Sequence, residues 1–324
     1  MEIPPEVIAA KNELANRLIE AGLITGIDFG VRDEEKPDPN DVVVRIFVAD
    51  TNNIPAEVQA AVQNFPFPVV VIQRVFRITT LPDTDSYRPV LGGVSVASSR
   101  FAAAGIVPVG TLGAIVTSSI FPGTLFGLSN WHVLCVDLAR QLSDEIIQPE
   151  PGVLGVLPGS RVGKLSGWSF PETAMDGFVD AAVCELEPAA LQEVADIGPV
   201  SGSVTATLAM QVRKRGRTTG LTFGYITGTG GDYPVDFPKL PAVTTSAGVL
   251  TTFRTQKNQI QIHIDFPLSI VFGEEGDSGS VVVDTTGKVV GLYWGSGSDG
   301  PGDPLKYGLA NPAAAVESAL GITF

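Results

Sequence analysis

The pattern of hydrophobic and polar positions divides the chain into two parts. A short first part alternates between helix-like and strand-like patterns, and the long remainder consists of brief apolar runs. Over residues 5–21 the apolar side chains recur at roughly helical spacing and Gly22 follows, which predicts an amphipathic helix. Residues 24–31, 42–48 and 69–75 are rich in β-branched side chains and predict strands. Residues 55–62 begin with a proline and predict a second helix. The order of these elements predicts a small α+β domain over residues 1–78.

From about residue 90 the pattern changes to one strand-like run after another, separated by turns. Residues 79–89 contain Pro82 among alternating polar positions and predict a linker. Residues 312–320 predict a closing helix. The 36 glycines and 24 prolines suit a β body with many turns better than a helical one. We therefore expect a mainly β domain over residues 90–324 that ends in a helix.

Two short motifs in this β region contain the residue types of nucleophilic acyl transfer. The segment 276–280 reads Gly-Asp-Ser-Gly-Ser and places Ser278 between glycines in a tight loop. The segment 129–133 reads Ser-Asn-Trp-His-Val and places His132 where a strand passes into a helix. A serine hydroxyl becomes a good nucleophile when an imidazole takes its proton and a carboxylate holds that imidazole in one tautomer. Asp180, which directly precedes the apolar run 181–183, is the candidate carboxylate.

The order of these residues along the chain separates the known classes of serine hydrolase. His132, Asp180 and Ser278 follow one another in the order used by the two-barrel serine proteases. The α/β-hydrolases run Ser, Asp, His, and both histidines of this chain precede Ser278. The subtilisin order needs another carboxylate and a helix after the serine, whereas residues 281–283 are three valines and favour a strand. The order indicates a serine peptidase of the two-barrel class.

Each candidate also has an ordinary structural interpretation. Gly-Asp-Ser-Gly is a common turn composition, so Ser278 alone would be weak evidence. Asp176, four residues before Asp180, competes as the carboxylate and is interpreted as a cap of the preceding loop. His263 lies in a period-2 strand with apolar residues on the other face, so we expect a solvent-facing strand histidine.

Together the motifs resemble those of the chymotrypsin-fold (trypsin-like) serine peptidases, in the bacterial branch related to the narrow-leaf trypsin-like proteins. The segment 212–220, Val-Arg-Lys-Arg-Gly-Arg-Thr-Thr-Gly, is similar to a strand and turn of bacterial secreted proteases, and the resemblance covers residue 90 to the C-terminus. It implies two six-stranded antiparallel β-barrels with a C-terminal helix. It also implies a serine endopeptidase that works through an acyl-enzyme on His132, Asp180 and Ser278, without cofactor or metal.

The resemblance implies roles for the residues around the serine. The backbone N–H groups of Gly276 and Ser278 would form the oxyanion hole, and glycine at 276 gives the turn the backbone freedom to aim them inward. Asp277 would be paired with Lys214 instead of with a new N-terminus. A trypsin-like cut after Arg88 is disfavoured because Pro89 follows, so we expect no obligatory N-terminal cleavage.

The same resemblance places the substrate pocket in the segment before the serine and in the later strand around residue 293. Glycines there leave room for a side chain and Phe272 makes the floor apolar, which favours a hydrophobic or small P1 residue. Glu274 or Glu275 is the alternative, as a carboxylate for a basic P1 residue, unless both are solvent-facing loop charges. The predicted pocket residues are Phe272, Tyr293, Trp294, Gly295 and Gly297.

Composition limits the partners and the compartment. A net charge of −14 and a pI near 4.5 argue against nucleic acid as a partner. The sequence has no apolar run of about 18 residues and its start lacks the features of a signal peptide, so we expect no membrane segment and a cytoplasmic protein. Cys135 and Cys184 flank the candidate site and are expected to be buried free thiols, with one bridge between them as the alternative.

Two classes of function follow. In the first, the protein is an intracellular serine endopeptidase whose N-terminal domain selects or regulates a restricted set of protein or peptide substrates; esterase activity alone is a variant of it. In the second, it is a catalytically silent or gated protease-fold interaction module. A homo-oligomer and an activating protein partner are the open alternatives for its assembly.

Overall fold

The computed structural model describes residues 3–77, 83–100, 109–151, 160–187, 189–266, 268–269, 271–300 and 303–324. The helices predicted at both ends of the chain are confirmed within two residues of their predicted ends. The three predicted strands of the first part are confirmed as well. The helical elements are α1 (Pro5–Glu20), η1 (Thr51–Asn53), α2 (Ala56–Asn64), α3 (Trp131–Leu134) and α4 (Ala313–Leu320).

The first of two β-barrels follows the N-terminal segment. Its strands are ordered β7-β6-β10-β11-β13-β9-β8. Only Gly113 separates β7 from β8, so these are two halves of one strand whose ends pair with β6 and β9 and close a six-stranded ring. The strands of this barrel are β6 (Val94–Ser98), β7 (Val109–Leu112), β8 (Ala114–Val116), β9 (Phe126–Ser129), β10 (Glu145–Ile147), β11 (Arg161–Ser169) and β13 (Ala181–Leu186). A separate small sheet is formed by the short strands β5 (Val90–Gly92), β14 (Ala190–Val194) and β15 (Gly198–Pro199).

The second barrel is also an antiparallel ring. Its order is β20-β23-β22-β21-β16-β17, and β17 pairs back onto β20. Its strands are β16 (Gln211–Gly216), β17 (Gly220–Asp236), β20 (Phe253–Ile264), β21 (Val281–Asp284), β22 (Val289–Ser298) and β23 (Tyr307–Pro312); β12 (Asp176–Gly177), β18 (Val243–Thr244) and β19 (Leu250–Thr251) are short additions. The predicted mainly β fold with two six-stranded barrels and a C-terminal helix is confirmed.

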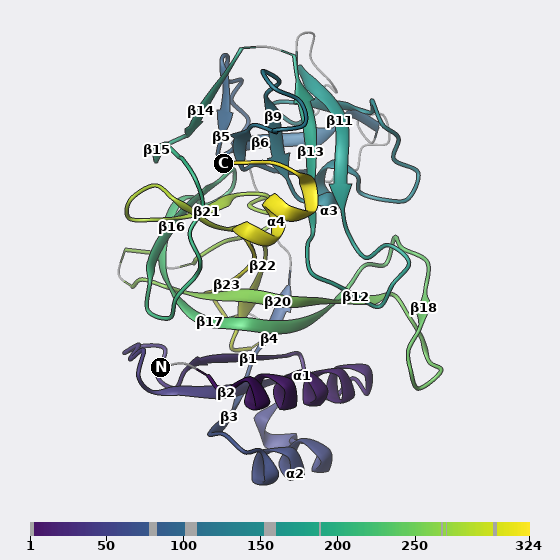
Figure 1. Ribbon diagram of the computed structural model, residues 1–324, viewed down its shortest axis with the longest axis vertical. Helices are drawn as coiled ribbons and strands as arrows, with labels where there is room; N and C mark the ends of the chain where they lie inside the picture. The colour runs from purple at the N-terminus through teal and green to yellow at the C-terminus, as the bar shows by residue number, and fades with distance from the viewer. Residues whose placement is uncertain are drawn as a thin grey trace.

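A shared apolar core joins the two barrels. Leu128 and Val183 from the first barrel pack in one cluster with Val281 and Leu292 from the second, and all four are buried. Val316 of α4 belongs to the same cluster. Helix α4 lies in the middle of the molecule, between the first barrel above and the second barrel below (Figure 1). This packing fixes the position of the loops that meet where the barrels touch.

The N-terminal segment extends the sheet of the second barrel. Strand β1 (Gly26–Val31) pairs with β17, then with β2 (Val42–Val48), which pairs with β3 (Val69–Gln73). Strand β4 (Val75–Arg77) pairs with β22. The segment therefore lies below the second barrel and is hydrogen-bonded to it at two strands (Figure 1). The division of the chain into domains at 78–89 stays a prediction; residues 79–82 of the predicted linker lie outside the described residues.

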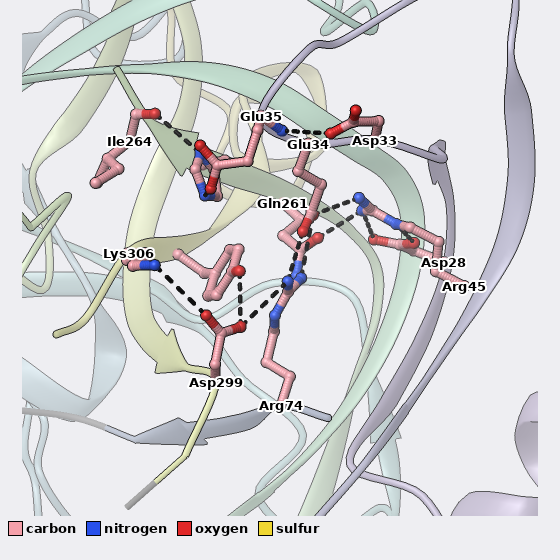
Figure 2. A network of polar contacts seen from close by, with 12 residues as sticks. Asp28, Asp33, Glu34, Glu35, Arg45, Arg74, Gln261, Ile264, Asp299 and Lys306 are labelled. Carbon is pink, nitrogen blue, oxygen red and sulfur yellow. Dashed lines mark hydrogen bonds and ion pairs between the residues drawn. The ribbon is translucent and has the colours of Figure 1, made fainter. Parts of the chain in front are cut away.

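A buried polar network fastens the same segment to the second barrel (Figure 2). The Arg45 guanidinium donates to both carboxylate oxygens of Asp28, at 2.7 and 2.5 Å, and to Gln261 Oε1 of β20 at 2.5 Å. Arg45 and Arg74 also donate to Glu34, at 2.6 and 2.5 Å. Burial by itself raises the pKa of Glu34, but the two guanidinium groups outweigh it and lower this pKa to about 2. Glu34 is therefore ionised at neutral pH.

The structure corrects the prediction for His263. Its side chain is buried rather than solvent-facing, and it packs against the Tyr307 ring with the ring centroids 5.0 Å apart. Its Nδ1 lies 2.9 Å from the Ile264 carbonyl oxygen, and Glu35 Oε1 lies 3.7 Å from its Nε2. The period-2 pattern identified the strand, but the N-terminal segment covers the face that the pattern indicated as exposed.

Candidate functional site

The pairing of two strands brings His132 and Asp180 together. In the antiparallel pair of β9 and β13, Ser129 lies opposite Ala182. Helix α3 begins just after β9, and Asp180 stands just before β13. The same register, continued beyond both strand ends, places Asp180 beside residues 131 and 132. The two residues that sequence analysis selected 48 positions apart therefore become neighbours through one strand pair.

Asp180 holds the histidine at two points. Its Oδ2 lies 2.5 Å from His132 Nδ1, and its Oδ1 accepts a hydrogen bond from the His132 backbone N–H at 3.2 Å. Asp180 is fully buried. Because the carboxylate takes Nδ1, it selects the tautomer in which Nε2 is free to act as a base.

Two asparagines that sequence analysis missed position the backbone of Asp180. Asn130 Nδ2 donates to the Asp180 carbonyl at 2.6 Å. Asn311, on β23, accepts from the Asp180 N–H at 3.0 Å and donates to its carbonyl at 3.2 Å. Both amides are fully buried. Asn130 belongs to the histidine motif and was within reach of the sequence argument, whereas Asn311 gives no local signal because it is 131 residues away from Asp180.

The competing carboxylate lies elsewhere. Asp176 is exposed, and its Oδ2 is 3.3 Å from Lys257 Nζ. Its backbone forms the short strand β12, which pairs in parallel with β20. Of the two candidates, only Asp180 contacts His132 among the described contacts.

The loop with Ser278 comes from the second barrel and has two glycines in the left-handed region. Gly276 has φ +90° and Gly279 has φ +98°. A Cβ on Gly279 would lie 2.2 Å from Ser129 Oγ, so only glycine fits where this loop touches the first barrel. Thr111 ties the loop down by donating its Oγ1–H to the Gly276 carbonyl at 2.7 Å and its N–H to the Ser278 carbonyl at 2.8 Å.

The polar groups that would perform the chemistry are mostly without partners in this conformation. Among the hydrogen bonds of the described residues, none uses the N–H of Gly276 or of Ser278. The Ser278 hydroxyl donates to the Trp294 carbonyl at 3.2 Å, and Ser278 is only 2% exposed. His132 Nε2 is buried and has no partner within the described part of the chain. The serine and the histidine are therefore not hydrogen-bonded to each other here.

Asp277, beside the serine, forms a buried ion pair with Lys214 of β16. Lys214 Nζ lies 2.9 Å from Asp277 Oδ2, and both side chains are fully buried. The same carboxylate accepts from Thr219 Oγ1 at 2.6 Å and from the Thr218 N–H at 2.9 Å. Burial by itself raises the pKa of Asp277, but the Lys214 ammonium and the hydrogen bonds outweigh it and lower the pKa below its usual value.

The predicted pocket residues from the serine loop and from β22 lie close together. Phe272 and Tyr293 are buried, with their ring centroids 6.0 Å apart. The Tyr293 hydroxyl lies 2.6 Å from Ser296 Oγ, which donates to the Gly273 carbonyl. Two aromatic rings therefore occupy this region, and only that of Tyr293 carries a polar group. Gly295 has open space where a Cβ would lie. Gly297 and Trp294 are buried, and the Trp294 indole N–H donates a hydrogen bond to Gln259 Oε1 of β20. Glu274 and Glu275 are half-buried.

A pocket of about 170 Å³ opens beside His132. One side is formed by Trp131, His132 and Val136, and the other by residues 236–240. We name residues 237–242 the strap. Phe237 of the strap packs edge-on against Phe170, at 4.7 Å between centroids, and Phe170 stacks on Trp131 at 4.4 Å. Phe170 therefore connects the strap to Trp131, the residue next to the histidine.

Both cysteines near the site are buried free thiols, as predicted. Burial raises the pKa of Cys135 and raises that of Cys184 to about 12, so both are protonated at neutral pH. Cys184 donates weakly to the Gly127 carbonyl, with a sulfur-to-oxygen distance of 3.6 Å. Their chemistry is that of small apolar core residues.

Comparison with known proteins finds similarity at the level of structure only. No family model matches the chain, and no curated protein does. Among solved structures, the chain is similar to Thermobifida fusca Protease A (17% identity, TM-score 0.46) and to Nocardiopsis protease (17%, 0.47), each over 72% of this chain and 97% of that one. It is also similar to Cellulomonas bogoriensis chymotrypsin (18%, 0.44), with the same coverage. The strand order by itself shows two six-stranded antiparallel barrels, the arrangement expected from the sequence.

The two-barrel architecture accounts for where the site lies. The histidine and the aspartate come from the first barrel and the serine loop comes from the second, so the packing of the two barrels sets how these two parts of the candidate site are placed. In the described residues, no helix is long and apolar enough to cross a membrane.

Proposed function

We propose that the protein is a serine endopeptidase in which Ser278 is the nucleophile, His132 the general base and Asp180 the residue that orients it. The observation that carries this proposal is the 2.5 Å contact between Asp180 and His132 Nδ1, which leaves Nε2 without a partner. Ser278 lies in a loop of the facing barrel. Its backbone carbonyl accepts a hydrogen bond from the Thr111 N–H, and the Thr111 carbonyl accepts one from the Ser129 hydroxyl, at the start of the histidine motif.

The reaction begins with a rotation of the serine side chain. In the proposed reaction the hydroxyl leaves the Trp294 carbonyl and turns toward His132 Nε2 by rotation about χ1. Ser278 Oγ then bonds to the peptide carbonyl carbon while Nε2 takes its proton. The negative oxygen that forms accepts from the N–H groups of Gly276 and Ser278. His132 returns the proton to the leaving amine as the peptide C–N bond breaks, and water hydrolyses the acyl-enzyme by the same sequence.

The residues beside the serine support a restricted substrate range. Phe272 and Tyr293 fill the region in which the resemblance places the P1 side chain, and Phe272 provides no charge. We propose that small or apolar P1 residues are preferred and that cleavage is confined to few protein or peptide substrates.

A second candidate, a gated or silent interaction module, is favoured by one observation. Ser278 is 2% exposed, and its hydroxyl is bonded to a carbonyl instead of to His132. A protein that kept this arrangement in solution would bind partners without cleaving them.

Active-site labelling distinguishes the two. The purified protein is treated with a fluorophosphonate, and the modified residue is located by mass spectrometry. We expect labelling at Ser278 that is lost in Ser278→Ala and His132→Ala and falls by a factor on the order of 10⁴ in Asp180→Asn, where the tautomer is wrong. His263→Asn is the matched control and should label at the wild-type rate. A folded wild-type protein that does not label would refute the endopeptidase and support the module.

A peptide library then separates endopeptidase from esterase. Cleavage of internal peptide bonds, detected by mass spectrometry, is expected for the wild type and not for Ser278→Ala. Hydrolysis of activated esters without any peptide cleavage would restrict the activity to an esterase.

A further inference from the structure

An apolar groove lies between the N-terminal segment and the hairpin that follows β17. It has a volume of about 700 Å³, within the range of roughly 300–1,000 Å³ typical of ligand sites. Its apolar lining comes from the end of α1 and the chain after it, from the loop that leads to Asp180, from β17 and from the β18–β19 hairpin. These apolar residues include Ile19, Ile24, Met175, Val235, Val249 and Phe253.

The groove is open to a partner on its hairpin side. Val249 is 57% exposed and Phe253 is 43% exposed, and the adjacent Leu250 is 69% exposed. Large apolar side chains gathered at one hollow surface are typical of an interaction site, whereas single exposed ones are ordinary.

The charged residues that line the described part of the groove are all acidic. Its described lining residues include the carboxylates of Glu20 and Asp236 and no lysine, arginine or histidine. An occupant with a positive charge is therefore favoured over one with a negative charge.

The end of β17 supplies a feature that suits an extended chain. In the described pairings, β1 accompanies β17 only as far as Asp232, whereas residues 234–236 pair with β20 alone. One edge of β17 is therefore without a neighbouring strand where residues 234–236 line the groove. Extended peptides bind such edges through main-chain hydrogen bonds, with alternate side chains in apolar pockets.

We propose that this groove is a docking site for an extended peptide segment of a partner protein that carries large apolar side chains and at least one basic residue. The apolar lining takes the side chains. The free edge of β17 takes the backbone mainly through its carbonyls, because Pro234 has no N–H to donate. Glu20 and Asp236 supply negative charge for the basic group.

The groove touches two chain segments that lie near proposed catalytic residues. Val235 and Asp236 run directly into the strap, which faces Trp131 and His132 across the pocket of about 170 Å³. Met175 lies in the loop that ends at Asp180, and its carbonyl accepts from the Thr255 N–H at 2.8 Å. A peptide in the groove therefore contacts the base of the strap and the loop of the aspartate at the same time.

Arg254 fixes the strap to that loop. Its buried guanidinium donates to the carbonyls of Pro241 in the strap at 2.8 Å, of Pro171 at 3.0 Å and of Glu172 at 3.1 Å. If docking displaces the strap or the loop, the Arg254 side chain transmits that displacement to the other segment, because it is hydrogen-bonded to both. We therefore expect the occupant to move the strap away from the pocket beside His132; docking does not depend on catalysis, but its effect on turnover rests on the proposed function.

Binding is tested on full-length Ser278→Ala, which cannot cleave the probe. The probe is the fluorescein-labelled peptide Lys-Ile-Val-Leu-Val-Lys, followed by fluorescence anisotropy. Control peptides replace both lysines by glutamate, or the four apolar residues by serine. We expect saturable binding of the lysine peptide that is at least about 10-fold tighter than that of either control, a difference of about 1.4 kcal/mol. No binding up to about 1 mM, or equal binding of the lysine and glutamate peptides, would overturn the proposal.

Exposed substitutions locate the binding site without threatening the fold. Val249→Asp places a charge in the groove, and Leu268→Asp, whose wild-type side chain is 63% exposed and does not line the groove, is the matched control. Val249→Asp should weaken binding of the lysine peptide by at least about 10-fold and Leu268→Asp should leave it unchanged. Glu20→Lys should reduce the preference for lysine over glutamate. Equal affinity in Val249→Asp and in Leu268→Asp would place the peptide elsewhere and overturn the assignment.

Hydrogen exchange tests the connection to the strap on the same inactive protein. Saturating peptide should accelerate exchange of the amides in residues 237–242, and unchanged exchange there would overturn the coupling. Because neither measurement needs turnover, docking without fluorophosphonate labelling of the wild type would refute the proposed peptidase and leave the docking site intact. Displacement of the peptide by phosphatidylcholine vesicles would assign the surface to lipid and overturn the proposal.

Discussion

The ion pair between Lys214 and Asp277 gives the sharpest test of how the serine loop is held. Lys214→Met removes the ammonium and keeps a flexible apolar side chain of similar length beside Phe272 and Tyr293, whose ring centroids lie 5.5 and 5.4 Å from Nζ. The variant leaves Asp277 buried without its counter-charge.

The size of the effect follows from the burial and from the remaining donors. Removing one partner of a buried pair costs about 3–5 kcal/mol, because the other charge stays out of water. Asp277 retains the hydroxyl of Thr219 at 2.6 Å and the N–H groups of Thr218 and Glu274 at 2.9 and 3.0 Å. These donors reduce the penalty, so we expect the free energy of unfolding to fall by about 3 kcal/mol, the lower end of that range.

Urea unfolding at pH 7, followed by tryptophan fluorescence, measures this loss. With a slope of about 3 kcal/mol/M, the midpoint should fall by about 1 M. Arg32→Met, which breaks the exposed Arg32–Asp41 pair, is the control and should change stability by less than about 1 kcal/mol. The double variant Lys214→Met/Asp277→Asn should be more stable than Lys214→Met, since neither charge of this pair remains buried. A Lys214→Met protein as stable as Arg32→Met would refute the argument.

Three further predictions concern acid stability, the N-terminal segment and the P1 region. The pKa of Glu34 falls from 4.5 to about 2 on folding, so its ionised form contributes about 3 kcal/mol to stability above pH 4.5, and this contribution is lost as the pH falls toward 2. In urea unfolding at pH 5 and at pH 3, Glu34→Gln should therefore lose less stability between the two pH values than the wild type. An equal loss in both proteins would contradict this prediction. A protein that begins at residue 83 should aggregate, because it exposes the edge of β17 and the apolar face beneath β1, and a folded monomer in size-exclusion chromatography would show otherwise. Tyr293→Ala should shift library cleavage toward bulky P1 residues and cost about 3–5 kcal/mol of stability, and an unaltered P1 profile would exclude Tyr293 from the pocket.

Much of the candidate site could be anticipated because its signals are local. Ser278 and its glycines are contiguous, and the structure has the positive φ angles that only glycine adopts easily at 276 and 279. His132 stands at a strand-to-helix transition that the residues on either side predict. Asp180 was preferred over Asp176 because it borders a buried strand, and the strand register explains why that position matters.

Other parts of the site depend on residues distant in sequence. Asn311 reaches Asp180 from the last strand, and Thr111 holds the serine loop from the first barrel. His263 was expected to face solvent because the alternating pattern describes one strand and its two faces. It cannot show that a segment more than 200 residues earlier covers the polar face.

The sequence by itself determined the elements of this protein, the order of its three chemically distinctive residues and the glycines that their turns require, because periodicity and backbone preference act over a few neighbouring residues. Tertiary structure alone decided that the first strands continue the sheet of the second barrel, that Arg45 and Arg74 are buried against Glu34, and that a strap lies beside His132. These features come from which surfaces meet, and the free energy of burying an apolar face or a charge depends on the partner that covers it. A strand edge or an arginine has the same local sequence signal whether it is covered or exposed.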